Sequence, residues 1–157
     1  MFPVRYLPNS LNRSDRKKQK TMLLKSRNMY KKGKYYTRKH VSSAKTKPSN
    51  HVSNARKMYH VHSVTPSKEL SLKTGCTLST LKKIVNKGEG AYYSSGSRPN
   101  QTPQSWGLAR LASSITGGNA AAVDFDLLEK GCDHSKPAFR LANQLNRRTI
   151  RKTRKIG

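Results

Sequence analysis

Acidic residues are scarce in this sequence: 7 Asp and Glu stand against 33 Lys and Arg among 157 residues, so the formal net charge is +26. The imbalance is uneven along the chain. Residues 1–65 carry a net charge of +16, residues 66–135 carry +2 and residues 136–157 carry +8. Because a globule holds so much like charge only when something neutralises it, we expect an anionic partner, either nucleic acid or an acidic protein surface.

Cysteine and long apolar runs are also scarce. The two cysteines, Cys76 and Cys132, give no disulfide framework and indicate a reducing compartment or simple core packing. No apolar run approaches the length of a membrane span, and the opening MFPVRYLP is too short and too polar for a signal peptide. We therefore expect no membrane span and synthesis in cytosol or nucleus.

Hydrophobic residues make up 33% of the chain, too few for one core over its whole length, and most lie between Val64 and Leu145. We predict a mainly α fold with three parts. Residues 1–65 form a basic extended arm with one helix, residues 66–145 a small helical domain, and residues 146–157 a basic tail. Ordering such arms costs about 1 to 2 kcal/mol per residue, so ordered arms would imply a large assembly.

The first arm combines a helix with an aromatic and basic stretch. Ser14 is expected to cap a helix that runs to Arg27 and carries lysines around a thin apolar stripe. From Tyr30 to Lys57, tyrosines interleave with basic residues. Lysines neutralise phosphates and tyrosines stack on bases, as in non-specific nucleic-acid binders, but a solvated basic linker is an equally open interpretation.

The central domain has its clearest helix after a Gly/Ser loop that spans Gly90 to Gly96. Thr102 is placed as N-cap and Pro103 as the first helical residue. The apolar residues that follow recur at the spacing of one buried helical face, and Gly117 supplies a left-handed stop: Leu108, Leu111, Ala112, Ile115. Trp106 is expected to pack in the core, with ligand contact as the alternative.

A helix-turn-helix register occupies the segment from Ser67 to Asn86. Thr65 is expected as the N-cap of the first helix, Gly75 marks the turn, and Leu81 and Ile84 pack the second helix back on the first. If this hairpin reads DNA, the exposed face of the second helix would carry Thr77, Ser79, Thr80, Lys82, Lys83 and Lys87. An ordinary helical hairpin needs the same glycine and aliphatic residues, so both interpretations stay open.

Three further segments raise chemical alternatives. The run from Tyr59 to Val64 alternates like a short strand, and its His60 and His62 would need Cys132 and His134 to hold zinc. That spacing matches no zinc signature, so ordinary polar histidines are the other interpretation and no cofactor is predicted. The loop from Gly90 to Arg98 is either a phosphate nest or a structural turn. No triad or paired acid and base is visible, which predicts a protein that is not an enzyme.

The last third is expected to hold two short helices. Asn119 or Asp124 caps one that ends near Gly131, and Ser135 caps another over Pro137 to Leu145. The cationic residues of both arms, the second helix and the loop are the candidates for binding nucleic acid or an acidic partner: Lys17, Lys18, Lys20, Lys31, Lys32, Lys34, Tyr35, Tyr36, Arg38, Lys39, Lys82, Lys83, Lys87, Arg98, Arg147, Arg148, Arg151, Lys152 and Arg154.

The string GAYYSSGSRPNQTPQSWG, followed by ARLASSITGG and the pair Val123 and Asp124, resembles a family of small basic domains encoded by large double-stranded DNA viruses of algae and amoebae. The segments MFPVRYLP and LSLKTGC are similar to that family too. The resemblance implies a viral origin and a place in the virion, and it carries no catalytic residues.

The expected function is thus a non-enzymatic structural component of a large DNA virus particle, either a minor capsid protein or an internal virion protein. Its basic arms would bind between capsid subunits or onto nucleic acid, which makes capsid proteins, other virion proteins and DNA the expected partners. The alternative is a DNA-binding or genome-condensing protein that uses the helix-turn-helix.

Overall fold

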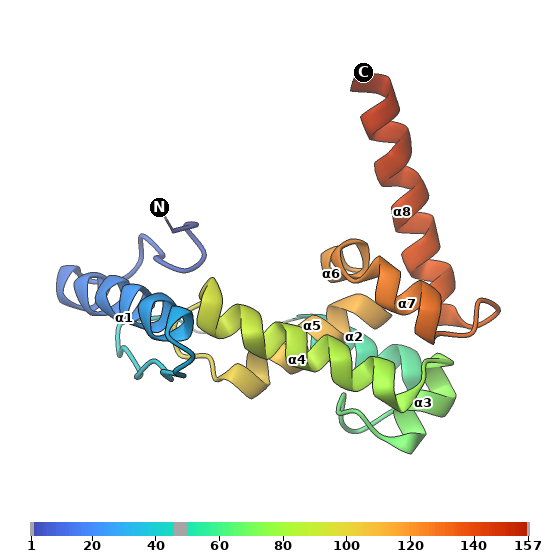
Figure 1. Cartoon of the computed structure of the whole chain (residues 1–157), viewed down its shortest axis with the longest axis horizontal. Coiled ribbons are helices and arrows are strands. Elements are labelled where there is room, and N and C mark those ends of the chain that lie inside the picture. Colours follow the sequence, from blue (N-terminus) through green and yellow to red (C-terminus); the bar gives the residue numbers. More distant parts are fainter. Residues whose placement is uncertain (1, 46–49, 157) are drawn as a thin grey trace. The chain divides into compact units, whose positions relative to one another are not determined.

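The computed structural model describes residues 2–45 and 50–156, with side chains described up to residue 150. Within these residues the chain is helical and has no strand beyond one isolated bridge, so the mainly α prediction is confirmed (Figure 1). The helices are α1 (Arg13–Lys31), α2 (Asn50–Tyr59), α3 (Lys68–Thr74), α4 (Leu78–Ser94), α5 (Pro103–Ile115), α6 (Asn119–Val123), α7 (Phe125–Gly131) and α8 (Pro137–Ile156).

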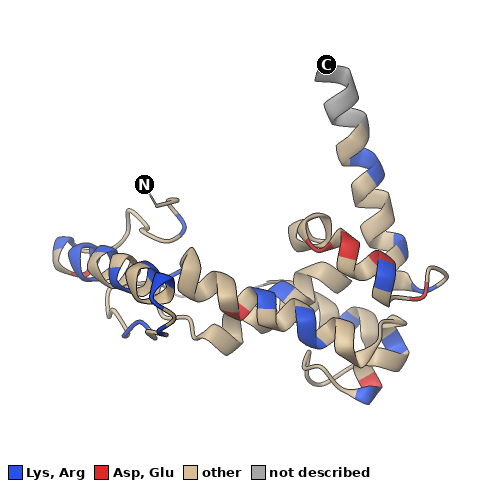
Figure 2. Ribbon diagram, in the orientation of Figure 1, with Lys and Arg blue, Asp and Glu red and all other residues tan. Residues whose placement is uncertain are grey.

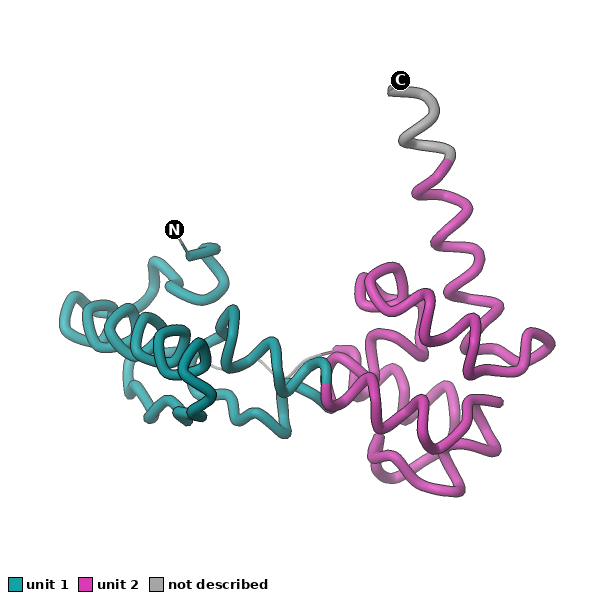
Figure 3. The backbone as a smooth tube through the Cα atoms, in the orientation of Figure 1, with its two compact units in different colours: residues 1–48, 87–107 teal, residues 49–86, 108–157 magenta. Residues whose placement is uncertain are grey.

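The chain divides into two compact units that do not follow the predicted boundaries (Figure 3). Unit 1 consists of residues 1–48 and 87–107, and unit 2 of residues 49–86 and 108–157. The boundaries fall inside α4 and α5. In the part of the chain that the structure describes, none of the helices has the length and apolar character that a membrane crossing requires.

Unit 1 shows that the N-terminal region is not an extended arm, because its residues have their own buried clusters. Helix α1 begins after Asn12, whose side chain accepts a hydrogen bond from the Asp15 amide, and not after Ser14 as predicted. Leu23 of α1 is fully buried against Tyr6, and Trp106 packs edge-on to Tyr6 with ring centroids 6.2 Å apart. Trp106 thus packs in a core, as the sequence predicted.

The segment expected as a Gly/Ser loop is largely helix in unit 1, since α4 continues through Ser94. The turn that follows is packed tightly: a Cβ on Gly96, whose φ is +126°, would lie 2.9 Å from a methyl group of Leu23. Ser97 is fully buried and donates to the Arg98 carbonyl at 2.8 Å. These contacts fit the structural turn rather than the phosphate nest.

Unit 2 is built around one apolar cluster to which all its helices contribute.

The prediction for α5 is confirmed: Thr102 Oγ1 accepts from the Ser105 amide at 3.0 Å, the apolar face is buried, and Gly117 has a φ of +72°. The α3–α4 hairpin also forms, with Gly75 left-handed at φ +80° and Leu81 and Ile84 fully buried. Its N-cap is Ser67 rather than Thr65.

Several local predictions in unit 2 are wrong. The run after Tyr59 is not a strand, because α2 ends there and His60 turns the chain with a φ of +53°. The stretch from Tyr30 to Lys57, for which a solvated linker was one interpretation, ends inside α2, and its residues 46–49 lie outside the described residues. The basic tail predicted from Asn146 is instead the continuation of α8 to Ile156.

The two cysteines are not free: Cys76 and Cys132 form a disulfide across an isolated antiparallel bridge. The Thr77 amide donates to the Gly131 carbonyl and the Asp133 amide to the Gly75 carbonyl, each at 2.8 Å. The turn between α3 and α4 is thereby joined to the segment between α7 and α8. With Cys132 oxidised, the zinc alternative fails, and the described residues contain no His, Cys, Asp and Glu cluster suited to a metal.

Gly131 is required where α7 meets α4. A Cβ at this position would lie 1.7 Å from Thr80 Oγ1 and 2.7 Å from Thr80 Cβ. We therefore expect Gly131→Ala to lower the free energy of unfolding by about 1 to 3 kcal/mol in a chemical denaturation experiment, the usual cost of forcing atoms into a packed site. In a Thr80→Gly background the same substitution should cost little, and an equal loss in both backgrounds would show that this contact is not the cause.

Candidate nucleic-acid interface

Helix α1 presents a long cationic face in unit 1, and Figure 2 marks the positions of its lysines and arginines in blue along the ribbon. Its buried side holds Asp15, Gln19, Met22, Leu23 and Ser26, and the opposite side is solvent-exposed. The predicted Lys17, Lys18 and Lys20 all lie in this exposed part, and Arg13, Arg16 and Lys25, which were not predicted, join them. Since 19 helical residues span about 28 Å at 1.5 Å per residue, the face is long enough to follow several phosphates.

The chain leaves α1 through a turn that adds further exposed cations. Lys31, Lys32, Lys34 and Lys39 are exposed, as is the predicted Tyr35. The Lys34 amide donates to the Met29 carbonyl at 2.9 Å, and Gly33 takes a φ of +74°. The turn therefore places Lys31, Lys32 and Lys34 at the end of the helix that carries the cationic face, whereas the Lys39 amide donates to Met22 Sδ farther back along α1.

Arg38 is a correction to the predicted interface, because its side chain is buried inside unit 1. Its guanidinium donates to the Tyr92 carbonyl at 2.9 Å, to Ser26 Oγ at 3.0 Å and to Ser97 Oγ at 2.7 Å. It also lies 3.7 Å from the centroid of the Tyr92 ring, and burial lowers its pKa. Arg38 thus holds three segments of unit 1 together and is not available to an external anion.

Tyr36 is also partly turned inward. It packs against the apolar cluster of Leu11, Met22 and Val41, and the Lys25 ammonium lies 4.4 Å from its ring centroid. Its ring therefore contributes mainly to the support of α1, and Tyr35 is the exposed member of the pair.

Acidic side chains neutralise little of the positive charge on the surface of unit 1. Unit 1 has a net charge of +15 and two acids, Asp15 and Glu89. Asp15 is buried and accepts a hydrogen bond from the Ser43 amide at 2.8 Å, and its hydrogen bonds with Ser43 lower its pKa. Glu89 is half-buried. The exposed charge of the described part of unit 1 is therefore almost entirely positive.

An apolar hollow interrupts the cationic face of α1. Phe2, Leu7 and Leu24 line it together with Arg16 and Lys20, and Arg16 Nη1 donates to the Leu7 carbonyl at 3.0 Å. The N-terminal segment is thus held against α1 by apolar contact and by one arginine.

The second helix of the α3–α4 hairpin carries the other predicted set, in unit 2 and at its boundary. Thr77, Ser79, Lys82, Lys83 and Lys87 are exposed. Thr80 is not: it is buried and its hydroxyl lies 2.8 Å from that of Thr77. The hairpin therefore has an exposed polar face of hydroxyls and lysines, without Thr80.

The remaining predicted cations are spread over other elements. Arg98 is exposed in the turn before α5, and Arg147 and Arg148 are exposed on α8. Arg151, Lys152 and Arg154 also belong to α8, but their side chains lie outside the described ones. Among the side chains that the structure describes, α1 and the turn after it therefore carry the longest run of exposed cations.

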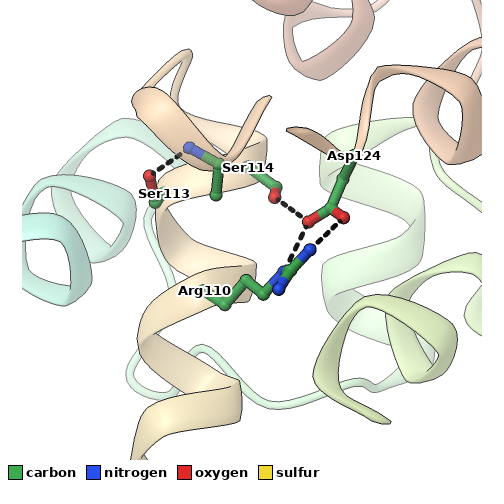
Figure 4. Close-up of polar contacts among 5 residues, drawn as sticks. Arg110, Ser113, Ser114 and Asp124 are labelled. Carbon is green, nitrogen blue, oxygen red and sulfur yellow. Dashed lines mark hydrogen bonds and ion pairs between the residues drawn. The ribbon is translucent and has the colours of Figure 1, made fainter. Parts of the chain in front are cut away.

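Asp124, at the start of α7, has a structural role that the sequence did not reveal (Figure 4). Asp124 is fully buried and binds Arg110 through both carboxylate oxygens, at 2.7 and 3.0 Å, and accepts from Ser114 Oγ at 2.9 Å. The Asp124 hydrogen bond raises the pKa of Arg110. Asp124 stands at the N-cap position of α7, one of the two caps that the sequence suggested, but its carboxylate binds Arg110 and Ser114 and makes no capping hydrogen bond.

Comparisons with known proteins place the chain in a family without assigning it an activity. A comparison with curated proteins and with solved structures finds no match. The model of one protein family matches residues 3–130, which include nearly all of unit 1 and the chain as far as α7. Since this match covers well over half of the sequence, the chain belongs to DUF5824, a family of unknown function.

Proposed function

We propose that the chain is a non-enzymatic protein that binds nucleic acid without reading its sequence, through the cationic face of α1 and the turn that follows it. The observation that carries this proposal is the net charge of unit 1, which is +15, with Asp15 buried and Glu89 half-buried. Binding to phosphates needs closely spaced exposed cations and no particular base contacts. The folded unit supplies these cations on a rigid helix, so little ordering entropy is lost on binding.

The resemblance to domains of large DNA viruses suggests the setting, namely a minor capsid or internal virion protein that contacts the packaged genome. The residues expected as a free N-terminal arm are folded in unit 1. An arm threaded between capsid subunits is therefore a weaker proposal than a folded basic unit bound to nucleic acid. Adhesion to acidic capsid proteins remains the competing role for the same surface.

Salt dependence tests the proposal. Anisotropy of a labelled oligonucleotide, titrated with the full chain between about 50 and 200 mM salt, should give an association constant that falls linearly on a log–log scale. The pair Lys17→Ala and Lys20→Ala should flatten the slope by roughly one per lysine. The matched pair Lys82→Ala and Lys83→Ala, which removes the same charge from α4, should change the slope less.

Two outcomes would contradict this. A larger change of the slope in the α4 pair would favour the second candidate, a DNA-binding protein that uses the α3–α4 hairpin. The exposed side chains of Ser79, Lys82 and Lys83 support that candidate. Tighter binding to poly-glutamate than to an oligonucleotide of equal charge would favour adhesion to acidic proteins.

A further inference from the structure

Three tyrosine rings from three segments of unit 1 meet beside the α1 turn. Tyr30 lies in the last turn of α1, Tyr35 follows the turn after that helix, and Tyr93 lies on α4. The ring of Tyr35 packs against both of the others, with centroids 6.2 Å from Tyr30 and 5.0 Å from Tyr93. The hydrogen bonds of the turn, from Lys32 and Lys34 to the Met29 carbonyl, bring Tyr35 back onto the helix.

The tyrosine cluster packs on one side against a buried residue, and on the other side its rings are exposed to solvent. Tyr92 is fully buried, accepts from the Arg38 amide at 2.9 Å and packs edge-on against Tyr93 at 5.2 Å. Tyr35 is 69% exposed and Tyr30 38% exposed. Folding does not require a large aromatic ring to stay exposed to water. An exposed ring held in place by two others therefore points to a ligand more strongly than a buried ring does.

The charges around the cluster favour an anionic ligand. Lys31, Lys32 and Lys34 are exposed and adjoin Tyr30 and Tyr35 in the chain. The opposing charge nearest in sequence to Tyr93 is Glu89, one turn earlier on α4, and this carboxylate is half-buried, whereas the lysines are exposed. Lysines beside an exposed ring match what single strands offer, since their bases present free faces next to phosphates, whereas the bases of a duplex are stacked on each other.

We infer that Tyr35, supported by Tyr30 and Tyr93, is a stacking site for an unpaired base, so that the nucleic acid bound by unit 1 is single-stranded at this point. The inference rests on the proposed function and adds a substrate class to it. The lysines of the turn bind the flanking phosphates, and the cationic face of α1 continues the path of the strand.

A protein partner is the other occupant that exposed tyrosines suit, because tyrosine is enriched at protein interfaces. The lysines disfavour it here, since lysine is depleted at the centre of such interfaces and enriched where phosphates are bound. The experiment below distinguishes the two.

The test compares Tyr35→Ala and Tyr35→Phe in the full chain, by anisotropy with a poly-dT oligonucleotide and with a duplex of equal length. Tyr35→Ala should weaken single-strand binding roughly 5- to 150-fold, the range found when a stacking aromatic is truncated, and should leave duplex binding nearly unchanged. Tyr35→Phe keeps the ring and should bind like the wild type. Because the ring is mostly exposed, the thermal unfolding of both variants should match the wild type.

A second readout does not depend on affinity. Tyr35→Trp places a fluorophore at the site, and stacking on poly-dT should quench its emission relative to the wild type, which has Trp106 alone. A chain that binds oligonucleotides with steep salt dependence, yet shows neither the loss in Tyr35→Ala nor the quenching, would overturn the stacking site and leave the proposed function standing. A chain that binds no oligonucleotide at low salt would overturn both, and would leave a protein partner as the occupant.

Discussion

Breaking the disulfide is expected to lower the free energy of unfolding of unit 2 by about 4 kcal/mol, which follows from the chain entropy that a cross-link of this span removes from the unfolded state. Cys76 and Cys132 are 56 residues apart, and both side chains are buried. The bond ties the α3–α4 turn to the segment before α8, so its loss frees two parts of the unit at once. Urea unfolding with and without reductant measures the difference.

The matched variant for this experiment is the double substitution Cys76→Ala and Cys132→Ala. It should unfold at the same urea concentration in both conditions, close to the reduced wild type. Two titratable thiols in the unfolded, unreduced wild type would contradict the account, as would coincident unfolding curves for the oxidised and reduced protein.

Asp124→Asn is expected to cost about 3 to 5 kcal/mol, because it leaves the partly buried Arg110 guanidinium without its charge partner. Asp124 has no exposed side-chain surface and Arg110 retains 19%. The pair joins α5 to the start of α7, and Ser114 adds a third bond to the carboxylate (Figure 4). Urea unfolding monitored by circular dichroism measures the loss.

Asp126→Asn is the matched control, since it removes the same charge from an exposed position of α7 and should change stability by less than about 0.5 kcal/mol. Replacing both members of the pair, by Arg110→Met with Asp124→Leu, should cost less than Asp124→Asn alone, because no buried charge is left unpaired. Equal losses for Asp124→Asn and Asp126→Asn would show that the ion pair contributes nothing to stability.

Elements with local signals could be predicted from the sequence. The α5 helix has a capping threonine, a proline at its start, a regular apolar face and a terminal glycine, all of which act within one or two turns. The α3–α4 hairpin likewise depends on Gly75 and on aliphatic spacing. Such signals concern neighbours in the chain, so they do not require knowledge of the tertiary structure.

Unit 1 could not be predicted in this way, because its contacts join residues far apart in sequence. Arg38 bonds to Tyr92 across 54 residues, and Val41 exchanges two hydrogen bonds with Asn100 across 59. Gly88 and Gly90 favour a loop by propensity, yet they lie inside α4, where Gly90 comes close to the Tyr30 hydroxyl. Tertiary packing outweighs propensity here, as it often does for weak local preferences.

The candidate site was predictable in its charges and not in its geometry. Lys17, Lys18 and Lys20 are exposed because nothing in a lysine-rich stretch favours burial. Burial of Arg38, by contrast, follows from bonds to Ser26, Tyr92 and Ser97 that no local pattern reveals. The same holds for Tyr93, whose neighbourhood with Tyr35 arises only when α4 packs beside the α1 turn within unit 1.

The most direct test of the central claim is ultraviolet cross-linking of the full chain to a single-stranded oligonucleotide, with the cross-linked peptides identified by mass spectrometry. We predict cross-links in α1 and the turn after it, with Tyr35 among the modified residues. Cross-links confined to residues 77–87 of the α3–α4 hairpin, with none between residues 13 and 39, would contradict the account.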